Sequence, residues 1–107
     1  MIISNHGEIF FNKELVGDAL DTVIAAFGIN NKTENVRLSK DNKSLTFAEY
    51  YESDLDQVLD DLISEIEEEG YIANGSILYL GDYSGSYEVN NNDIVVFEDE
   101  EDEDGEE

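Results

Sequence analysis

The acidic residues of this 107-residue chain are concentrated in its second half. Residues 1–43 contain six Asp or Glu and five Lys or Arg, whereas residues 44–107 contain twenty-two acidic residues and no Lys or Arg. Because an ionised carboxylate is almost never buried without a partner, the second half must keep these side chains at its surface. The formal net charge of -23 disfavours binding to nucleic acid or an anionic membrane, and it favours a positively charged protein surface as the partner.

A single domain is the expected organisation. A chain of this length buries only about two thirds of its extended surface, which is too little for two cores. The hydrophobic content of 40% is nevertheless ordinary for a folded protein. We therefore expect one α+β domain over residues 1–97. Residues 98–107 hold nine acidic residues around Gly105, and like-charge repulsion predicts a disordered tail there.

Several functional classes conflict with the composition. No run of residues approaches the roughly 20 apolar residues of a membrane helix, and the first residues do not look like a secretion signal, so we expect a protein of the bacterial cytoplasm. The lack of Cys excludes a disulfide framework and a thiolate metal site, and with one His we do not expect a zinc site. No nucleophile motif is present, and we expect neither a cofactor, a metal site nor an enzyme.

The apolar spacing of the first half predicts a strand, a helix and a hairpin. Residues 9–11 suggest a strand, and Asn12 then resembles an N-cap before a helical apolar face that ends with Phe27 and Gly28. Alternating apolar residues at 36–38 and 45–47 flank residues 40–43, which indicates a hairpin with its turn at Asp41 and Asn42.

The second half predicts one strong helix and three short strands. Ser53 followed by Asp56 resembles a capping box, and apolar residues recur at helical spacing until Gly70, so the helix should cover Ser53–Glu69. Strands are expected at 76–82, 87–89 and 94–97. The whole order predicts an α+β two-layer sandwich, with two helices packed on one face of a mainly antiparallel sheet.

Every charged residue of the predicted second helix is acidic. Its acidic residues are Asp54, Asp56, Asp60, Asp61, Glu65, Glu67, Glu68 and Glu69, and Glu49 and Glu52 precede them. Like charges four residues apart destabilise a helix by about 0.2–0.5 kcal/mol per pair, and acids at its C-terminus oppose the helix dipole. A helix selected for stability alone would mix the signs, so the pattern indicates a functional constraint.

A tyrosine pair at a predicted turn is a further candidate for a partner contact. Tyr83 and Tyr87 flank residues 84–86, and Asp82 lies in the same turn. Tyrosine is favoured at interfaces because it offers a large rigid surface with a polar tip. The alternatives are plain surface for the two rings and a backbone-accepting turn residue for Asp82.

The charge density of the chain is close to that of duplex DNA. Twenty-three charges correspond to about 39 Å of duplex, and a globule of this size spans roughly 35 Å. The small size, the acidic helix and the base-free second half resemble phage-encoded DNA mimics, among them inhibitors of restriction enzymes, CRISPR nucleases and DNA glycosylases. This resemblance implies an inhibitor that blocks the nucleic-acid channel of a bacterial defence or DNA-processing protein, with an RNA-guided CRISPR nuclease as the expected target.

Two other functions fit the same charge pattern. An immunity protein would cover the active surface of a basic toxin such as a nuclease, and an acidic scaffold would bind many cationic proteins. In each case the contacts would come from the acidic helix with Glu49 and Glu52, and from Asp82, Tyr83 and Tyr87.

Overall fold

The structure is a computed structural model that describes residues 2–29 and 35–98. The chain forms, in order, β1 (Ile3–Phe11), α1 (Gly17–Phe27), β2 (Val36–Leu38), β3 (Ser44–Tyr51), α2 (Leu55–Glu67), β4 (Ala73–Gly81), β5 (Gly85–Asn90) and β6 (Asp93–Glu98). Glu98, the first residue of the predicted tail, is the last residue of β6, and the rest of that tail lies outside the described residues.

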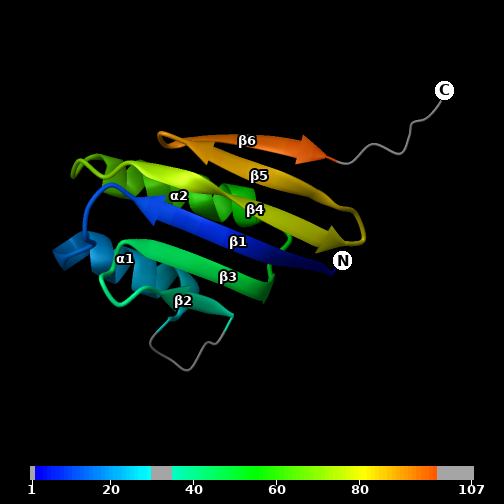
Figure 1. The fold of residues 1–107 in the computed structure, drawn as a ribbon, viewed down its shortest axis with the longest axis horizontal. Coiled ribbons are helices and arrows are strands. Elements are labelled where there is room, and N and C mark those ends of the chain that lie inside the picture. The colour runs from blue at the N-terminus through cyan, green and yellow to red at the C-terminus, as the bar shows by residue number, and fades with distance from the viewer. Residues whose placement is uncertain (1, 30–34, 99–107) are drawn as a thin grey trace.

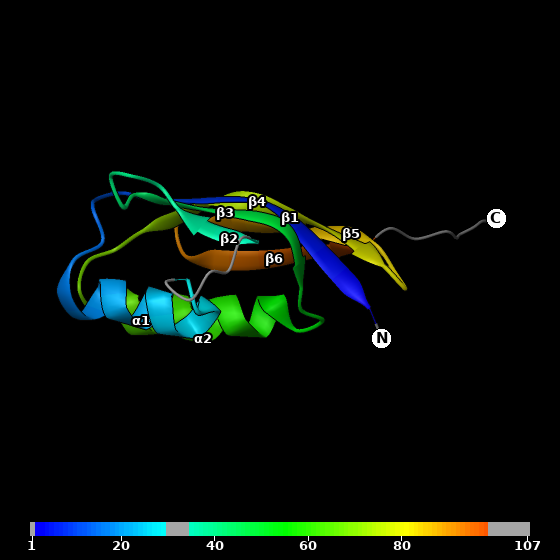
Figure 2. The same ribbon diagram turned by 90° about the horizontal axis from the view of Figure 1, so that it is seen from below.

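The strands form one six-stranded sheet in the order β2-β3-β1-β4-β5-β6 (Figure 1). Every neighbouring pair is antiparallel. Both helices lie on the same side of this sheet and leave its other face open (Figure 2). The predicted α+β two-layer sandwich is therefore confirmed.

The hydrophobic core lies between the helices and the sheet. The alternation of strand side chains directs Ile9, Leu45 and Ile77 toward the helices, and these residues are at most 1% exposed. α2 contributes five buried residues from one side: Leu55, Leu59, Leu62, Ile63 and Ile66. This apolar stripe fixes the rotation of α2 about its axis and so decides where its acidic residues point.

The predicted hairpin is present in the expected register. Val36 pairs with Phe47 and Leu38 with Leu45, and Asn42 adopts the left-handed backbone conformation that suits Asn in a turn. Asp41 accepts a hydrogen bond from the Ser39 hydroxyl at 2.6 Å, and this bond holds the pKa of its carboxyl below the usual value.

The start of the first helix differs from the prediction. α1 begins at Gly17 rather than after Asn12, because residues 12–16 form an irregular segment whose Asn12 and Leu15 amides donate to the carbonyls of Ile72 and Asn42. The Asn12 side chain accepts from the Ile72 amide at 2.8 Å and donates to the Gly70 carbonyl at 3.2 Å, so it ties the end of β1 to the start of β4. Gly28 ends α1 in a left-handed conformation, as predicted.

The start of the second helix also differs. The N-cap residue of α2 is Asp54, not Ser53, and no side-chain hydrogen bond caps this helix. The Asp54 amide instead donates to the Glu52 carboxylate at 3.2 Å, which bends the chain from β3 into the helix. The capping-box prediction was therefore wrong, although the predicted helix lies within two residues of its expected ends.

Candidate functional site: the acidic surface of α2

The acidic residues of α2 form two rows. Successive helical residues are rotated by about 100°, and the buried apolar stripe occupies one side of the helix. On one flank of the stripe lie Asp54, Asp61, Glu65 and Glu68, which we call the α1-side row; on the other lie Asp56, Asp60 and Glu67, the β6-side row. Gln57 and Ser64 occupy the outermost position between them and are exposed.

The separation of the two rows is close to the width of a nucleic-acid groove, and their charge density is about half that of a duplex. The seven carboxylates of the two rows, from Asp54 to Glu68, extend over about 21 Å of helix axis, or one charge per about 3 Å, against about 1.7 Å for the two strands of a duplex together. The two rows are about 130° apart around the helix axis. On a helix about 11 Å wide this angle separates them by about 10 Å, which is close to the width of the major groove. The helix therefore presents two parallel lines of negative charge.

The α1-side row borders a groove between the two helices. Asp61 and Glu65 line this groove together with Thr22 and Ala25 of α1, and it has a volume of about 450 Å³. The side chains that α1 contributes are small, so the two carboxylates are not screened by bulky neighbours. Asp61 also accepts a hydrogen bond from Gln57 Nε2 at 3.0 Å, one turn away, which restrains its carboxylate.

The β6-side row lies against the edge strand of the sheet. Asp56 and Asp60 line a small cleft with Ile94 and Val96 of β6, of about 170 Å³. The buried Tyr87 lies nearby in the neighbouring strand β5. Burial raises the pKa of the Tyr87 hydroxyl, and the Asp56 carboxylate raises it further, so this phenol stays neutral and adds no charge to the row.

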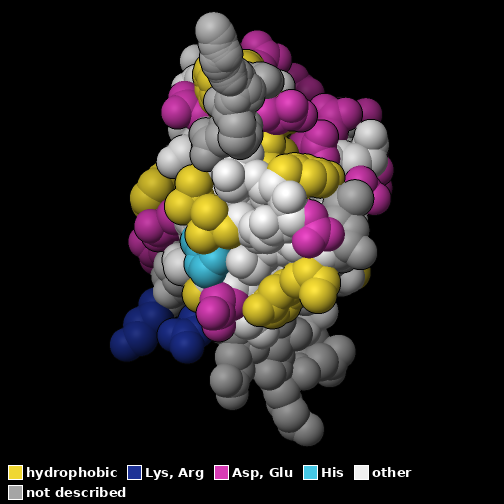
Figure 3. All heavy atoms as spheres, turned by 90° about the vertical axis from the view of Figure 1, so that its right-hand side faces the viewer, with side chains coloured by type: hydrophobic (Ala, Val, Ile, Leu, Met, Phe, Trp, Pro, Cys, Tyr) yellow, Lys and Arg dark blue, Asp and Glu magenta, His cyan; other side chains and the backbone are white. Residues whose placement is uncertain are grey.

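Positive and negative side chains are segregated in the fold. Of the four Lys and Arg side chains that the structure describes, Arg37, Lys40 and Lys43 belong to the β2–β3 hairpin at one edge of the sheet. The fourth, Lys13, donates its Nζ to the carbonyl of Glu69 at the end of α2. Figure 3 shows Lys and Arg at the lower left, whereas Asp and Glu are most frequent at the top, on the β6 side, and a few also lie lower down, next to the cations.

The remaining predicted contact residues lie outside the two rows. Glu52 adjoins Asp54 in the turn before α2, whereas Glu49 is exposed on β3. Asp82 occupies the turn between β4 and β5, where its carboxylate accepts a hydrogen bond from the Ile2 amide at 3.2 Å. Tyr83, in the same turn, is 49% exposed and packs edge-to-face on Tyr79.

The expected exposure of Tyr87 was wrong. Tyr87 is only 4% exposed and stacks on Tyr79 with ring centroids 4.8 Å apart. The register of β5 explains this, because Tyr87 pairs with Ile77 and alternates toward the helices. This residue belongs to the core that supports α2, and it is not available to touch a partner.

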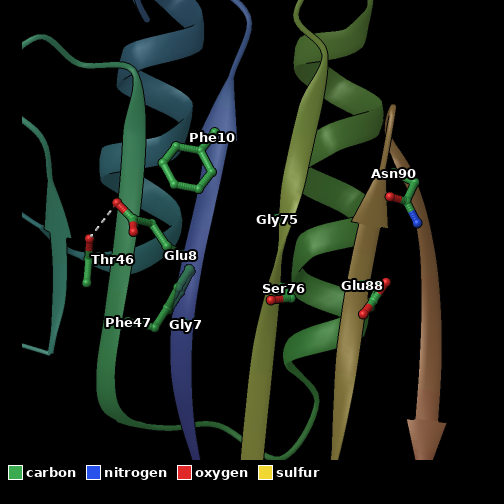
Figure 4. A pocket seen from close by; sticks show the side chains of 9 residues that line it. All are labelled: Gly7, Glu8, Phe10, Thr46, Phe47, Gly75, Ser76, Glu88 and Asn90. Carbon is green, nitrogen blue, oxygen red and sulfur yellow. Dashed lines mark hydrogen bonds between the residues drawn. The ribbon is translucent and has the colours of Figure 1, made fainter.

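The open face of the sheet contains a shallow hollow of about 730 Å³ (Figure 4). Gly7 and Gly75 form part of its floor, and the carboxylates of Glu8 and Glu88 lie on either side of Ser76. Glu8 accepts a hydrogen bond from the Thr46 hydroxyl at 3.4 Å and points toward β3, away from Glu88. The two carboxylates therefore do not converge on a common point.

Comparison with protein-family models, curated proteins and solved structures gives no match to this chain. Within residues 2–29 and 35–98, no group of three or more His, Asp or Glu side chains is placed to hold a metal ion. No helix of this described part is long and apolar enough to cross a membrane.

Two features of the acidic surface were not recognised in the sequence. Asp18 and Asp21 add exposed negative charge on α1, and their spacing of three residues on a helix was a readable signal. The contact between Asp56 and β6 had no sequence signal, because it depends on the order of the strands in the sheet.

Proposed function

We propose that this protein is an acidic DNA mimic that inhibits a bacterial defence or DNA-processing protein by occupying its nucleic-acid channel. The observation that supports this proposal most directly is the pair of carboxylate rows on α2, which face solvent on both flanks of the helix and have no Lys or Arg within the helix. The target that we expect is an RNA-guided CRISPR nuclease.

The physical basis is competition for a cationic groove. Lys and Arg side chains that bind the phosphates of a duplex respond to the density of negative charge, and the two rows together offer about one charge per 3 Å, roughly half the density of the duplex. Because Arg37, Lys40 and Lys43 lie at the opposite sheet edge, Lys13 at the end of α2 is the one described cation that would repel a basic partner near the rows. α2 is also held rigidly by its five buried residues, so little entropy is lost when the rows bind.

The test is displacement of a labelled DNA duplex from a purified RNA-guided nuclease. We expect the protein to displace the duplex, and its affinity for the nuclease to fall at least about tenfold between about 0.1 M and about 0.5 M salt. Unchanged affinity over this range, or a ternary complex that retains the duplex, would contradict the proposal.

A matched pair of variants locates the contact. Asp61→Lys with Glu65→Lys reverses two charges of the α1-side row, and Glu8→Lys with Glu88→Lys makes the same change in net charge on the open face of the sheet. We expect the first variant to no longer displace the DNA duplex from the nuclease, and the second variant to retain most of this activity. Equal losses in the two variants would show that only the net charge matters and would reject a shaped mimic.

A further inference from the structure

The outer edge of β6 is an unpaired strand edge. β6 is the last strand of the sheet, and no backbone hydrogen bond between described residues reaches its outer side. Edge strands are usually protected by Lys, by Pro or by a bulge, because an open row of amides and carbonyls can pair with another chain. Residues 94–97 of β6 are Ile-Val-Val-Phe and contain none of these protections.

The turn before β6 determines which of its backbone groups point outward. Asn91 and Asn92 form a two-residue turn with φ of 49° and 76°, the conformation of a type I′ hairpin, so Asn90 and Asp93 form the first hydrogen-bonded pair. The backbone groups of Asp93, Val95 and Phe97 therefore bond to β5. Those of Ile94, Val96 and Glu98 face away from the sheet.

The side chains beside this edge specify the chemistry of an added strand. Ile94 and Val96 face α2, where they meet Asp56 and Asp60 of the β6-side row. Residues of an added strand that lie opposite Ile94 and Val96 would project on the same side, toward the carboxylates. In an added strand, every second residue is about 6.6 Å from the next on the same side, and Asp56 and Asp60 are about 6 Å apart along the helix. Cations at every second position of the added strand would therefore match the spacing of these two carboxylates.

The opposite side of the same edge is apolar. Val95 and Phe97 are 43% and 51% exposed on the open face of the sheet. The intervening residues of an added strand would pack beside them and would therefore be apolar. Pairing of β6 with the β6 of a second copy is disfavoured, because it would bring the Asp56 and Asp60 carboxylates of both copies together.

We propose that β6 binds an extended segment of the partner protein in which Lys or Arg alternates with apolar residues, and that this segment adds to the sheet as a seventh strand. The inference rests on the proposed function in that the partner is cationic. It goes further in assigning backbone pairing to Ile94, Val96 and Glu98 and charge pairing to Asp56 and Asp60.

A synthetic peptide probes this edge without the partner. The probe is a blocked hexapeptide that alternates Arg and Val, and its control has the same composition with three Arg followed by three Val. We expect the alternating peptide to bind more tightly and to slow amide hydrogen exchange at Ile94 and Val96. The Val95 and Phe97 amides, which already bond to β5, serve as the internal reference. Equal affinity of the two peptides, or no added protection at Ile94 and Val96, would overturn the proposal.

Two kinds of variant make the test specific. Val96→Pro removes an outward N–H without removing a bond to β5, and it should weaken the alternating peptide at least about tenfold. Asp56→Asn with Asp60→Asn should weaken it about five- to thirtyfold, as expected for the loss of two ion pairs. The matched variant Asp61→Asn with Glu65→Gln removes the same charge from the α1-side row, and it should change the affinity less than about twofold. Equal weakening by the two charge variants would overturn the assigned site.

The outcome separates this inference from the proposed function. If the protein displaces DNA from the nuclease but the peptide does not slow amide exchange in β6, the added strand is rejected and the proposed DNA mimic is retained. Peptide protection without displacement of DNA would support the edge site and reject the channel blocker. A dimer seen by sedimentation that Val96→Pro abolishes would show that a second copy occupies the edge, and would overturn the assignment of the occupant.

Discussion

Lys13 Nζ donates a hydrogen bond to the carbonyl oxygen of Glu69 at a distance of 2.8 Å. The same ammonium lies 4.6 Å from the centroid of the Tyr71 ring, at the end of α2 where three consecutive glutamates accumulate. A cation from the loop after β1 therefore compensates the negative end of a helix that contains no cation of its own.

Replacing Lys13 by Met should lower the stability of the fold by about 1 kcal/mol, because it removes a charge that favours the helix end and a cation–π contact. For a domain of this size, that corresponds to a fall in Tm of about 4–8 °C. Thermal unfolding followed by circular dichroism measures it. Lys40→Met, at the exposed hairpin turn, is the control and should leave Tm within about 2 °C. Equal changes in both variants would contradict a specific role for Lys13.

Reversing two charges on α2 should stabilise the protein while it weakens inhibition. Asp60→Lys with Glu65→Lys converts the repulsive pairs with Asp56 and Asp61 into attractive ones, which should raise the free energy of unfolding by about 1–2 kcal/mol. Urea unfolding measures this change. Glu8→Lys with Glu88→Lys alters the net charge equally without such pairs and should give a smaller gain. A loss of stability in the α2 variant would show that its acids are needed for folding.

Asn5 should be essential for the connection between β3 and α2. Its side chain is fully buried, and Nδ2 donates to the carbonyls of Tyr50 and Glu52 at 2.8 and 2.9 Å, whereas Oδ1 has no hydrogen-bond partner among the described residues. Asn5→Ala should cost about 2–3 kcal/mol, because two part-buried carbonyls lose their donor. Asn5→Asp, of nearly the same shape, should cost more at pH 7, since it places a carboxylate beside those carbonyls. Urea midpoints of the two variants check the order.

The close approach of β1 and β4 should make Gly7 intolerant of any side chain. A Cβ at Gly7 would overlap the carbonyl oxygen of Ser76 and lie 2.6 Å from the Ile77 Cα. Gly17 also has a positive φ, of 58°, but no atom lies within 4 Å of its Cβ position. Gly7→Ala should therefore unfold the protein or separate the two strands, whereas Gly17→Ala should cost only about 1–2 kcal/mol of backbone strain. Similar Tm values for the two variants would contradict the packing.

Tyr87 should make the protein sensitive to alkaline pH. Burial, and then the Asp56 carboxylate, raise the pKa of its hydroxyl above the ordinary value of 10.0. The folded state therefore holds the proton more tightly than the unfolded state. The free energy of unfolding is not affected by this group below pH 10, and it falls as the pH rises above 10. Tyr87→Phe should reduce this alkaline loss, with Tyr51→Phe on the exposed surface as the control. Unfolding free energies at several pH values from 8 to 11 measure the slope.

Most of the fold was readable from apolar periodicity, because each element buries one face. The spacing of Leu55, Leu59 and Leu62 placed α2 within two residues of its ends, and the alternation around Asn42 placed the β2–β3 hairpin. The first half of β1 was missed, since its sequence Ile3–Glu8 mixes polar residues with Gly7 and shows no regular alternation. Its pairing with β3 and β4 on both sides determines its conformation instead.

The acidic site was only partly predictable. Identifying the acids of α2 required nothing beyond the sequence, and their division into two rows follows from the rotation of about 100° per residue. The neighbour of each row is a tertiary property: the groove beside Asp61 requires α1, and the cleft beside Asp56 requires the position of β6. The burial of Tyr87 likewise depends on strand register, which a single-residue shift would invert.

The separation of the β2–β3 cations from the α2 carboxylates makes the charge distribution asymmetric across the width of the sheet. In the field of a cationic surface such a molecule experiences a torque as well as an attraction, and it turns its α2 side forward before contact. Diffusional encounters are then biased toward productive orientations, so the fraction of collisions that lead to docking exceeds that of a protein with the same net charge spread evenly.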